Sequence, residues 1–183
     1  MKALNVGIIG YGYWGTNLVR NFFNTEGCNL SMVADGRPER LAQLSKIYPS
    51  VRLVTSAEEL IKDPGIDAVV IATPVFTHFE LARKALLNGK HVLIEKPMTS
   101  SVRESDELIN LAAQKGLTLM VDHTFLYTGA VQKMKQLIDE DIIGSAQYFD
   151  STRINLGLFQ PDINVLWDLA PHDLSMLFTW LGE

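Results

Sequence analysis

Residues 4–15 read LNVGIIGYGYWG, and this stretch decides the fold. The first six residues form a short, mostly apolar run, which is typical of a strand buried inside a sheet. Three glycines follow, and a segment of helical period covers residues 17–24. We therefore expect a strand, a tight glycine turn and a helix in succession, as at the start of a parallel α/β sheet.

Strand-like and helix-like segments keep alternating to residue 122. Short apolar runs bounded by turn residues predict strands at 30–34, 52–54, 68–72, 91–95 and 117–122. Segments of helical period between them predict helices at 38–47, 57–61 and 76–87. Ser101 and Glu104 form a capping-box pattern that opens a last helix, which ends at Lys115 before Gly116. This order implies a doubly wound parallel sheet with right-handed crossovers.

The pattern changes beyond residue 122. An amphipathic helix is expected at 130–139, and the alternating segment SAQYFDSTRI at 145–154 predicts a strand. We assign residues 1–124 to a Rossmann-type first domain and residues 125–183 to the beginning of an α+β second domain. On this interpretation we expect the 183 residues to be the N-terminal portion of a longer protein.

The composition is that of a globular protein in a reducing compartment. Of the 183 residues, 47% are hydrophobic and 20% are charged, which suffices for a buried core. The net charge of −5 argues against nucleic acid or an anionic membrane as a partner. Cys28 is the single cysteine and allows no disulfide within the chain. No apolar run suits a signal peptide or a membrane span, so we predict a cytoplasmic protein.

Gly10, Gly12 and Gly15 form a GxGxxG motif in an informative context. The motif follows a strand and opens a helix, and Asp35 lies at the end of the next strand, as in dinucleotide-binding folds. In that setting Gly10 permits the turn, Gly12 leaves room for a pyrophosphate, and Gly15 lets helix and strand approach closely. The N–H groups at the helix start would bind the phosphates. This context disfavours the alternative, a simple glycine turn with a surface carboxylate.

The acid after the second strand bears on the choice of cofactor. A carboxylate at Asp35 would accept hydrogen bonds from the ribose hydroxyls and repel a 2′-phosphate, which favours NAD over NADP. Arg37 has the opposite chemistry, because a guanidinium can bind a 2′-phosphate. We predict NAD as the cofactor, with Arg37 as the residue that complicates this preference.

Two further segments carry polar residues in apolar surroundings. Glu95 and Lys96 stand at the end of the strand HVLIE, where parallel sheets bind ligands. In WDLAPHDL, residues 167–174, Asp168 and His172 are four apart and would share one face of a helix. Taken singly, these segments also suit a solvated ion pair, a core histidine, or a helix-capping cluster behind Pro171. Their combination with the glycine loop favours a functional site.

The motifs together resemble a known family. Gly10–Gly15, ATP at 72–74 with His78, EKP at 95–97, and Asp168-x-x-x-His172-Asp173 occur in this order. The chain resembles, over its whole length, the glucose-fructose oxidoreductase/inositol dehydrogenase/MocA family. GYWGTNLVRN (12–21), HTFLY (123–127) and residues 155–174 are similar to its nucleotide-sugar branch, the UDP-N-acetylglucosamine-type 3-dehydrogenases.

The resemblance implies an NAD(P)-dependent oxidoreductase that transfers a hydride between a nicotinamide and a sugar hydroxyl or ketone. It implies a sugar or nucleotide sugar as substrate and a homo-oligomeric assembly. It assigns His172 as the acid/base, Lys96 as the stabiliser of charge on the reacting oxygen, and Asp168 as the group that orients Lys96 and the sugar. Some members use the lysine for proton transfer, so the division between His172 and Lys96 stays open.

The resemblance also assigns the residues around the ligands. The cofactor residues are Gly10, Tyr11, Gly12, Tyr13, Trp14, Gly15, Asp35, Thr73, Pro74, His78, Glu95 and Lys96. Tyr11, Tyr13 and Trp14 are expected to pack beside the cofactor. Arg153 and Asn155 are substrate candidates, although a solvated or structural Arg153 is an equal alternative, and Asp173 is expected to cap the helix or bind a neighbour. The four histidines lack ligand spacing, so no metal is expected.

Two other classes of protein share part of this pattern. A Rossmann dehydrogenase for another substrate class would have the same glycine loop, but Lys96 and His172 argue against it. A non-enzymatic dinucleotide-binding regulator of the same fold would have no need of these two residues.

Overall fold

The computed structural model describes residues 3–154 and 163–182. The chain divides into two compact units, residues 1–121 and residues 122–183. The predicted substrate residue Asn155 lies outside the described residues.

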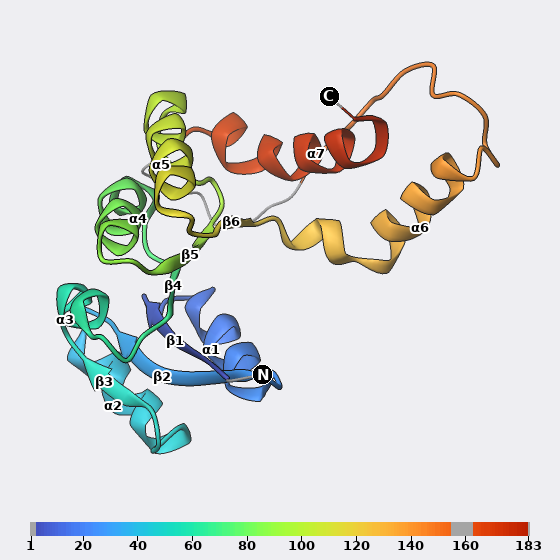
Figure 1. Cartoon of the computed structure of the whole chain (residues 1–183). Helices are drawn as coiled ribbons and strands as arrows, with labels where there is room; N and C mark the ends of the chain where they lie inside the picture. Colours follow the sequence, from blue (N-terminus) through green and yellow to red (C-terminus); the bar gives the residue numbers. More distant parts are fainter. Residues whose placement is uncertain (1–2, 155–162, 183) are drawn as a thin grey trace. The chain divides into compact units, whose positions relative to one another are not determined.

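The first unit is organised around a six-stranded sheet of order β3-β2-β1-β4-β5-β6 (Figure 1). Every strand pair with a recorded register is parallel. The strands are β1 (Leu4–Ile9), β2 (Cys28–Ala34), β3 (Arg52–Val54), β4 (Ala68–Ile71), β5 (His91–Glu95) and β6 (Leu119–Asp122). β1 lies at the centre, and the strand order reverses between β1 and β4, which is where such sheets bind ligands. The predicted doubly wound parallel sheet is confirmed.

Helices connect the strands as expected. They are α1 (Gly15–Asn24), α2 (Pro38–Ile47), α3 (Ala57–Lys62), α4 (His78–Leu87) and α5 (Val102–Lys115). A short 3-10 turn, η1 (Val75–Thr77), precedes α4, so the helix predicted at 76–87 begins with tighter winding after Pro74. α5 begins and ends as predicted, with the Ser101 hydroxyl accepting from the Glu104 amide and Gly116 in the left-handed region. The Glu104 carboxylate reaches back to the Ser100 amide, one residue before the N-cap.

Apolar side chains cover both faces of the sheet. Alternate residues of a strand point to opposite faces, and along β4 Val69 and Ile71 join one buried cluster while Val70 joins the other. α3, α4 and α5 cover the first face, and α1 and α2 cover the second. Each fully buried Leu, Ile or Val stabilises the fold by about 1.5–3 kcal/mol relative to exposure. The sheet is thereby held rigidly, and its carboxyl edge is a firm support for ligand contacts.

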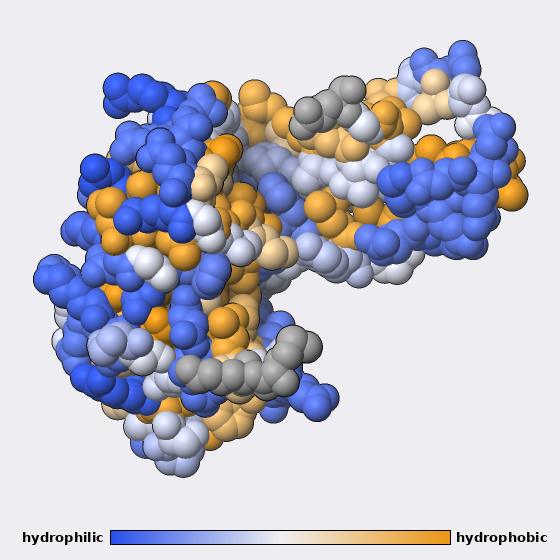
Figure 2. All heavy atoms as spheres, viewed as in Figure 1, coloured by the Kyte–Doolittle hydropathy of each residue, from blue (hydrophilic) through white to orange (hydrophobic). Residues whose placement is uncertain are grey.

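In the described part of the second unit there are two helices and a 3-10 turn. They are η2 (Thr124–Tyr127), α6 (Gly129–Asp139) and α7 (Val165–Leu181), and all three pack against one another. The Trp180 indole N–H donates to the Val131 carbonyl over 3.0 Å, which links α7 to α6. The helix predicted at 130–139 is confirmed. Figure 2 shows apolar side chains among polar ones along α7, and Leu174 and Phe178 are exposed.

The strand predicted at 145–154 was wrong. These residues are in neither a helix nor a strand, and almost all of them are exposed. A strand needs a neighbour to take up its backbone hydrogen bonds, and no part of residues 3–154 or 163–182 pairs with this segment. The alternating pattern indicates that these side chains suit a strand. A strand also needs backbone hydrogen bonds from a neighbouring strand, and the described residues supply none to this segment.

Within the same described residues, no helix has both the length and the apolar character needed to cross a bilayer.

Candidate functional site

The glycine loop lies at the carboxyl edge of the sheet, between β1 and α1. The strand register places Ile9 beside Ala34 on one side and Ile71 on the other. The residues that follow these strands therefore meet at one level. Gly10 has φ +99°, and a Cβ there would lie 2.3 Å from the Ala72 carbonyl oxygen. A Cβ at Gly15 would lie 2.2 Å from the Gly10 carbonyl oxygen, so helix and loop touch through backbone.

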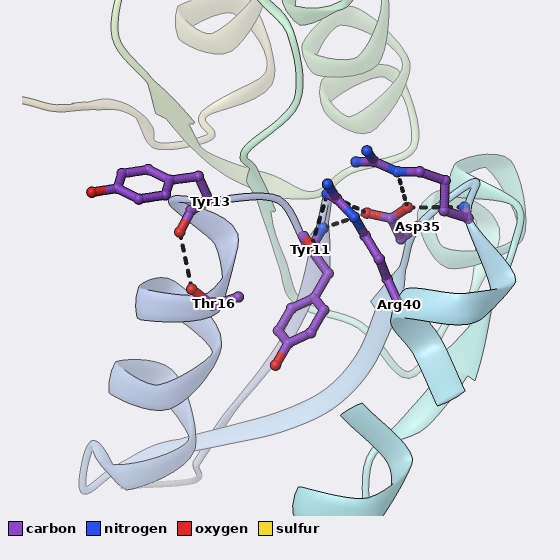
Figure 3. Close-up of polar contacts among 6 residues, drawn as sticks. Tyr11, Tyr13, Thr16, Asp35 and Arg40 are labelled. Carbon is purple, nitrogen blue, oxygen red and sulfur yellow. Dashed lines mark hydrogen bonds and ion pairs between the residues drawn. The ribbon is translucent and has the colours of Figure 1, made fainter. Parts of the chain in front are cut away.

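Asp35 braces this loop from the end of β2 (Figure 3). Its side chain is only 4% exposed. One carboxylate oxygen accepts from the Tyr11 amide over 2.7 Å, and the other accepts from the amide and Nε of Arg37 over 2.9 and 3.3 Å. Burial acts to raise the pKa of Asp35, but the hydrogen bonds from Tyr11 and Arg37 outweigh it and hold the pKa below its usual value. Asp35 is therefore an ionised, hydrogen-bonded carboxylate at neutral pH.

Arg40, on the first turn of α2, is a site residue that the sequence analysis missed. Its Nη1 donates to the Tyr11 carbonyl over 3.0 Å and lies 3.9 Å from the Asp35 carboxylate (Figure 3). A Cβ at Gly12 would lie 3.3 Å from the same nitrogen. The sequence feature that could have indicated Arg40 is its position five residues after Asp35. A residue at this distance can reach the glycine loop when α2 packs against the sheet.

A hollow of about 510 Å³ lies beside the loop. Its lining residues are Tyr11, Gly12, Tyr13, Thr16, Asn17, Arg40 and Gln43. The N-terminus of α1 has no side-chain cap, and a helix N-terminus beside an arginine favours a bound anion. The absence of a side chain at Gly12 leaves the backbone open to close approach. These features fit the pyrophosphate and ribose of a dinucleotide.

The three aromatic residues of the loop have different surroundings. Tyr11 is buried and packs in the core cluster on the α1 and α2 face. Burial raises the pKa of its hydroxyl, and Tyr48 adds to the effect. Tyr13 is 78% exposed and Trp14 is partly exposed, with their ring centroids 6.5 Å apart. Tyr11 therefore serves the fold, while Tyr13 and Trp14 are accessible at the mouth of the loop.

A second group of predicted residues surrounds the ends of β4 and β5. His78 is 1% exposed, and its ring lies between the carbonyl oxygens of Thr73 and Pro97. The Thr73 hydroxyl bonds to that of Thr77 over 2.6 Å. Lys96 follows β5, and its amide donates to the Glu95 carboxylate over 3.3 Å. His78 thus links the segment after β4 to the segment after β5 through contacts with backbone carbonyl groups.

Asp168, His172 and Asp173 lie on α7 of the second unit. Asn164 is the N-cap of this helix, and its side-chain oxygen accepts from the Trp167 amide over 2.9 Å. His172 is therefore well inside the helix, which excludes a capping role for it. Asp168 and His172 are one turn apart and share a face. His172 as a whole residue is 9% exposed, so it is largely shielded from water.

An aromatic and ionic cluster surrounds His172. Its ring lies edge-on to Phe125, with centroids 4.7 Å apart. The Arg153 guanidinium lies 5.0 Å above the same Phe125 ring and forms two hydrogen bonds of 2.8 and 2.9 Å to Asp173. The pKa of Asp173 is lowered by the hydrogen bond from Arg153, and the pKa of Arg153 is raised by the same bond. Asp173 therefore binds a neighbour, one of its two expected roles. Phe125 had no signal in the sequence beyond its place in HTFLY.

Within residues 3–154 and 163–182, no group of three or more His, Cys, Asp or Glu side chains could hold a metal ion.

The chain belongs to a family of oxidoreductases. The family model GFO_IDH_MocA, described as an oxidoreductase family with an NAD-binding Rossmann fold, matches residues 4–123. This match confirms the resemblance drawn from the motifs.

Individual relatives extend the match to the whole chain. It is 32% identical to a UDP-N-acetylglucosamine 3-dehydrogenase of Acidithiobacillus ferrooxidans over 100% of this chain and 56% of that protein. It is 28% identical to the NADP-dependent scyllo-inositol 2-dehydrogenase IolW of Bacillus subtilis over 91% of this chain and 45% of that protein. A crystal structure of an oxidoreductase from Klebsiella pneumoniae is 32% identical, with a TM-score of 0.84 over 100% of this chain and 52% of that chain. The chain thus spans about half the length of these relatives.

Proposed function

We propose that this oxidoreductase is an NAD-dependent dehydrogenase of a nucleotide sugar. The observation that carries the proposal is the glycine loop braced by the buried Asp35 carboxylate and by Arg40 beside an open hollow. The glycine loop and the start of α1 hold the pyrophosphate, and Asp35 and Arg40 lie where the adenosine ribose would bind. Thr73, Pro74, Glu95 and Lys96 hold the nicotinamide end. When bound, NAD accepts the hydride from the sugar carbon.

The preference for NAD rests on the charge of Asp35. A buried carboxylate that stays ionised repels a 2′-phosphate and has accepting capacity for ribose hydroxyls. NADP is the second candidate, on a specific observation: the Arg37 side chain is 53% exposed and already sits beside Asp35. Arg37 and Arg40 would turn outward to bind a 2′-phosphate, at the cost of their contacts with Asp35.

Proton transfer is assigned to His172. Loss of a hydride from carbon requires loss of a proton from the hydroxyl oxygen, and histidine titrates in the range that suits a general base. Phe125 packs against the His172 ring and fixes its orientation. Lys96 donates a hydrogen bond to the reacting oxygen and stabilises its developing negative charge. Asp168 orients Lys96 and the sugar hydroxyls, and the alternative in which Lys96 itself moves the proton is retained.

A nucleotide sugar suits the residues proposed for the substrate. The diphosphate of such a substrate is an anion that arginine recognises well. Asp173 occupies Nε and Nη2 of Arg153, so Nη1 remains as the donor for a phosphate oxygen. Asn155, two positions further along the sequence, is the second residue proposed to bind the substrate. We also propose a homo-oligomer, as the family resemblance implies. The acidic charge argues against a nucleic-acid or anionic membrane partner, and the single cysteine suits the reducing cytoplasm.

Calorimetric titration with NAD and NADP tests the cofactor proposal. We expect NAD to bind more tightly, and Gly12→Val to weaken binding by at least about tenfold because its side chain blocks the approach of the pyrophosphate. Gly129→Ala is the control, because its Cβ would meet nothing within 4 Å. Equal binding of NAD by the wild type and Gly12→Val would refute the site.

A panel of UDP-sugars and inositols tests the substrate proposal. Absorbance of the reduced nicotinamide is followed after adding each compound with NAD. We expect UDP-N-acetylhexosamines to give the strongest signal. A signal from inositols alone would replace the nucleotide sugar by a free polyol, and NAD binding without any oxidation across the panel would favour a regulator.

A further inference from the structure

His78 is a buried histidine whose side chain joins two site segments by backbone contacts. It is the first residue of α4, and its ring is 1% exposed. Nδ1 lies 3.0 Å from the Pro97 carbonyl oxygen, and Nε2 lies 2.8 Å from the Thr73 carbonyl oxygen. Thr73 follows β4, and Pro97 follows Lys96 at the end of β5. The ring therefore contacts both of the segments that are proposed to hold the nicotinamide end.

The two partners restrict the protonation state of this ring. A carbonyl oxygen can only accept a hydrogen bond, whereas a neutral imidazole has one N–H and one lone pair. In either neutral tautomer, one ring nitrogen would direct its lone pair at a carbonyl oxygen less than about 3 Å away, which is repulsive. Both contacts are hydrogen bonds only if both nitrogens carry a proton.

We propose that His78 is a doubly protonated imidazolium in the folded protein and acts as a clamp that positions the Thr73 and Lys96–Pro97 segments. Hydrogen bonds with an ionised donor are roughly twice as strong as neutral ones. The clamp thus fixes the backbone on both sides of the nicotinamide end. Its effect on cofactor binding rests on the proposed function, whereas the protonation state does not.

Several factors act on this charge in opposite directions. Glu80 stands two residues after His78 in the first turn of α4, and Glu95 ends β5 two residues before Pro97; their negative charges favour a cation. Lys96, which precedes Pro97, the positive end of the α4 dipole and the burial of His78, which is 1% exposed, oppose it. In this proposal, the two carbonyl oxygens that face the two ring nitrogens make the charged imidazolium more favourable than the neutral ring. A neutral ring would have to move away from one of these carbonyl groups.

The protonation state can be read directly by nuclear magnetic resonance. Histidine labelled with ¹⁵N in its ring is incorporated, and one-bond N–H correlations are recorded at about pH 7.5, where an ordinary histidine with a pKa near 6.5 is mostly neutral. His78→Gln identifies the signals. We expect two slowly exchanging N–H signals from His78. A single N–H signal, with the second nitrogen unprotonated, would overturn the proposal.

The same spectrum holds an internal control. His91 accepts a hydrogen bond at Nδ1 from the Thr118 amide over 3.0 Å. This nitrogen must therefore be unprotonated, and we expect at most one N–H signal from His91. The contrast between one signal and two separates a true imidazolium from a general effect of burial or of solvent exchange.

A binding experiment tests the positioning role. His78→Gln should weaken NAD binding about tenfold, as expected for loss of a charged hydrogen bond, and should leave ADP-ribose binding unchanged because that ligand lacks the nicotinamide. Equal weakening of both ligands, or no weakening, would overturn the positioning role. If the wild type binds neither ligand, the proposed function fails, while the N–H signals still decide the state of His78.

Discussion

The two units hold their proposed site residues in different ways. In the first unit, Asp35 and His78 are buried and bonded to the backbone of the loops that they support. In the second, His172 rests against Phe125, Arg153 pairs with Asp173, and the Trp180 indole donates to the Val131 carbonyl. The loops of the first unit are thus fixed to its core through backbone hydrogen bonds. In the described part of the second unit, the proposed catalytic residues lie on a helix whose side chains are partly exposed.

The largest expected effect is a loss of turnover, and it is expected for one residue of each unit. Made separately in a complete enzyme, Lys96→Ala and His172→Ala should each lower turnover by about 10²–10⁴, the usual contribution of general acid–base groups. Affinity for ADP-ribose should change little in either variant, because the adenosine and pyrophosphate contacts lie at the glycine loop, whereas Lys96→Ala also removes a proposed contact at the nicotinamide end of NAD. Steady-state kinetics with ADP-ribose titrations separates the two effects. Near-normal turnover of His172→Ala would make His172 a structural residue.

A glycine substitution tests how rigidly the first unit is built. Gly10→Ala places a Cβ 2.3 Å from the Ala72 carbonyl oxygen at φ +99°. We expect a loss of about 3 kcal/mol or more in unfolding free energy, since backbone strain and overpacking add. Urea unfolding measures it, with Gly36→Ala as the matched control because its Cβ meets nothing within 4 Å. Equal stability of the two variants would mean that the loop is pliable.

Replacement of the bracing acid should alter the choice of cofactor. Asp35→Asn removes the negative charge and keeps the size of the side chain. We expect the ratio of NADP to NAD affinity to rise by about tenfold, since repulsion of the 2′-phosphate is lost. Titration of both cofactors against wild type and variant gives this ratio. An unchanged ratio would assign the preference to Arg37 and Arg40.

The smallest expected effect is on stability and concerns the ion pair between Arg153 and Asp173. The pKa of Asp173 is lowered by its hydrogen bond from Arg153, so the stability it contributes is present above its unfolded pKa of about 3.9 and is lost as pH falls through the lower folded value. Asp173→Asn should cost about 1 kcal/mol or less near pH 7, as for a partly exposed pair. The difference from wild type should shrink below about pH 3.

Fluorescence of Trp180, which contacts the Val131 carbonyl, reports unfolding of this unit in a background with Trp14→Phe and Trp167→Phe, where Trp180 is the tryptophan that remains. A difference that is constant from neutral to acid pH would show that charge pairing with Arg153 is not the source of the stability. Arg153→Gln should give the same trend.

The sequence by itself determined the elements of the first unit. Strand and helix periods reflect which side chains face the core, and this information is local. It located α2, β3 and β5 at their observed bounds and placed the glycine loop between β1 and α1. The motifs also sufficed to recognise the family, because each occurs once and their order along the chain is the one typical of that family.

Only the tertiary structure decided which groups meet. Asp35 and Tyr11 are 24 residues apart, and His78 and Pro97 are 19 apart. Their contacts depend on the register of β1, β2, β4 and β5, which no local pattern encodes. The same reason explains why Arg40 was missed and why the segment 145–154 was predicted as a strand. A side-chain preference is a property of the segment, whereas a hydrogen-bond partner is supplied by the rest of the fold.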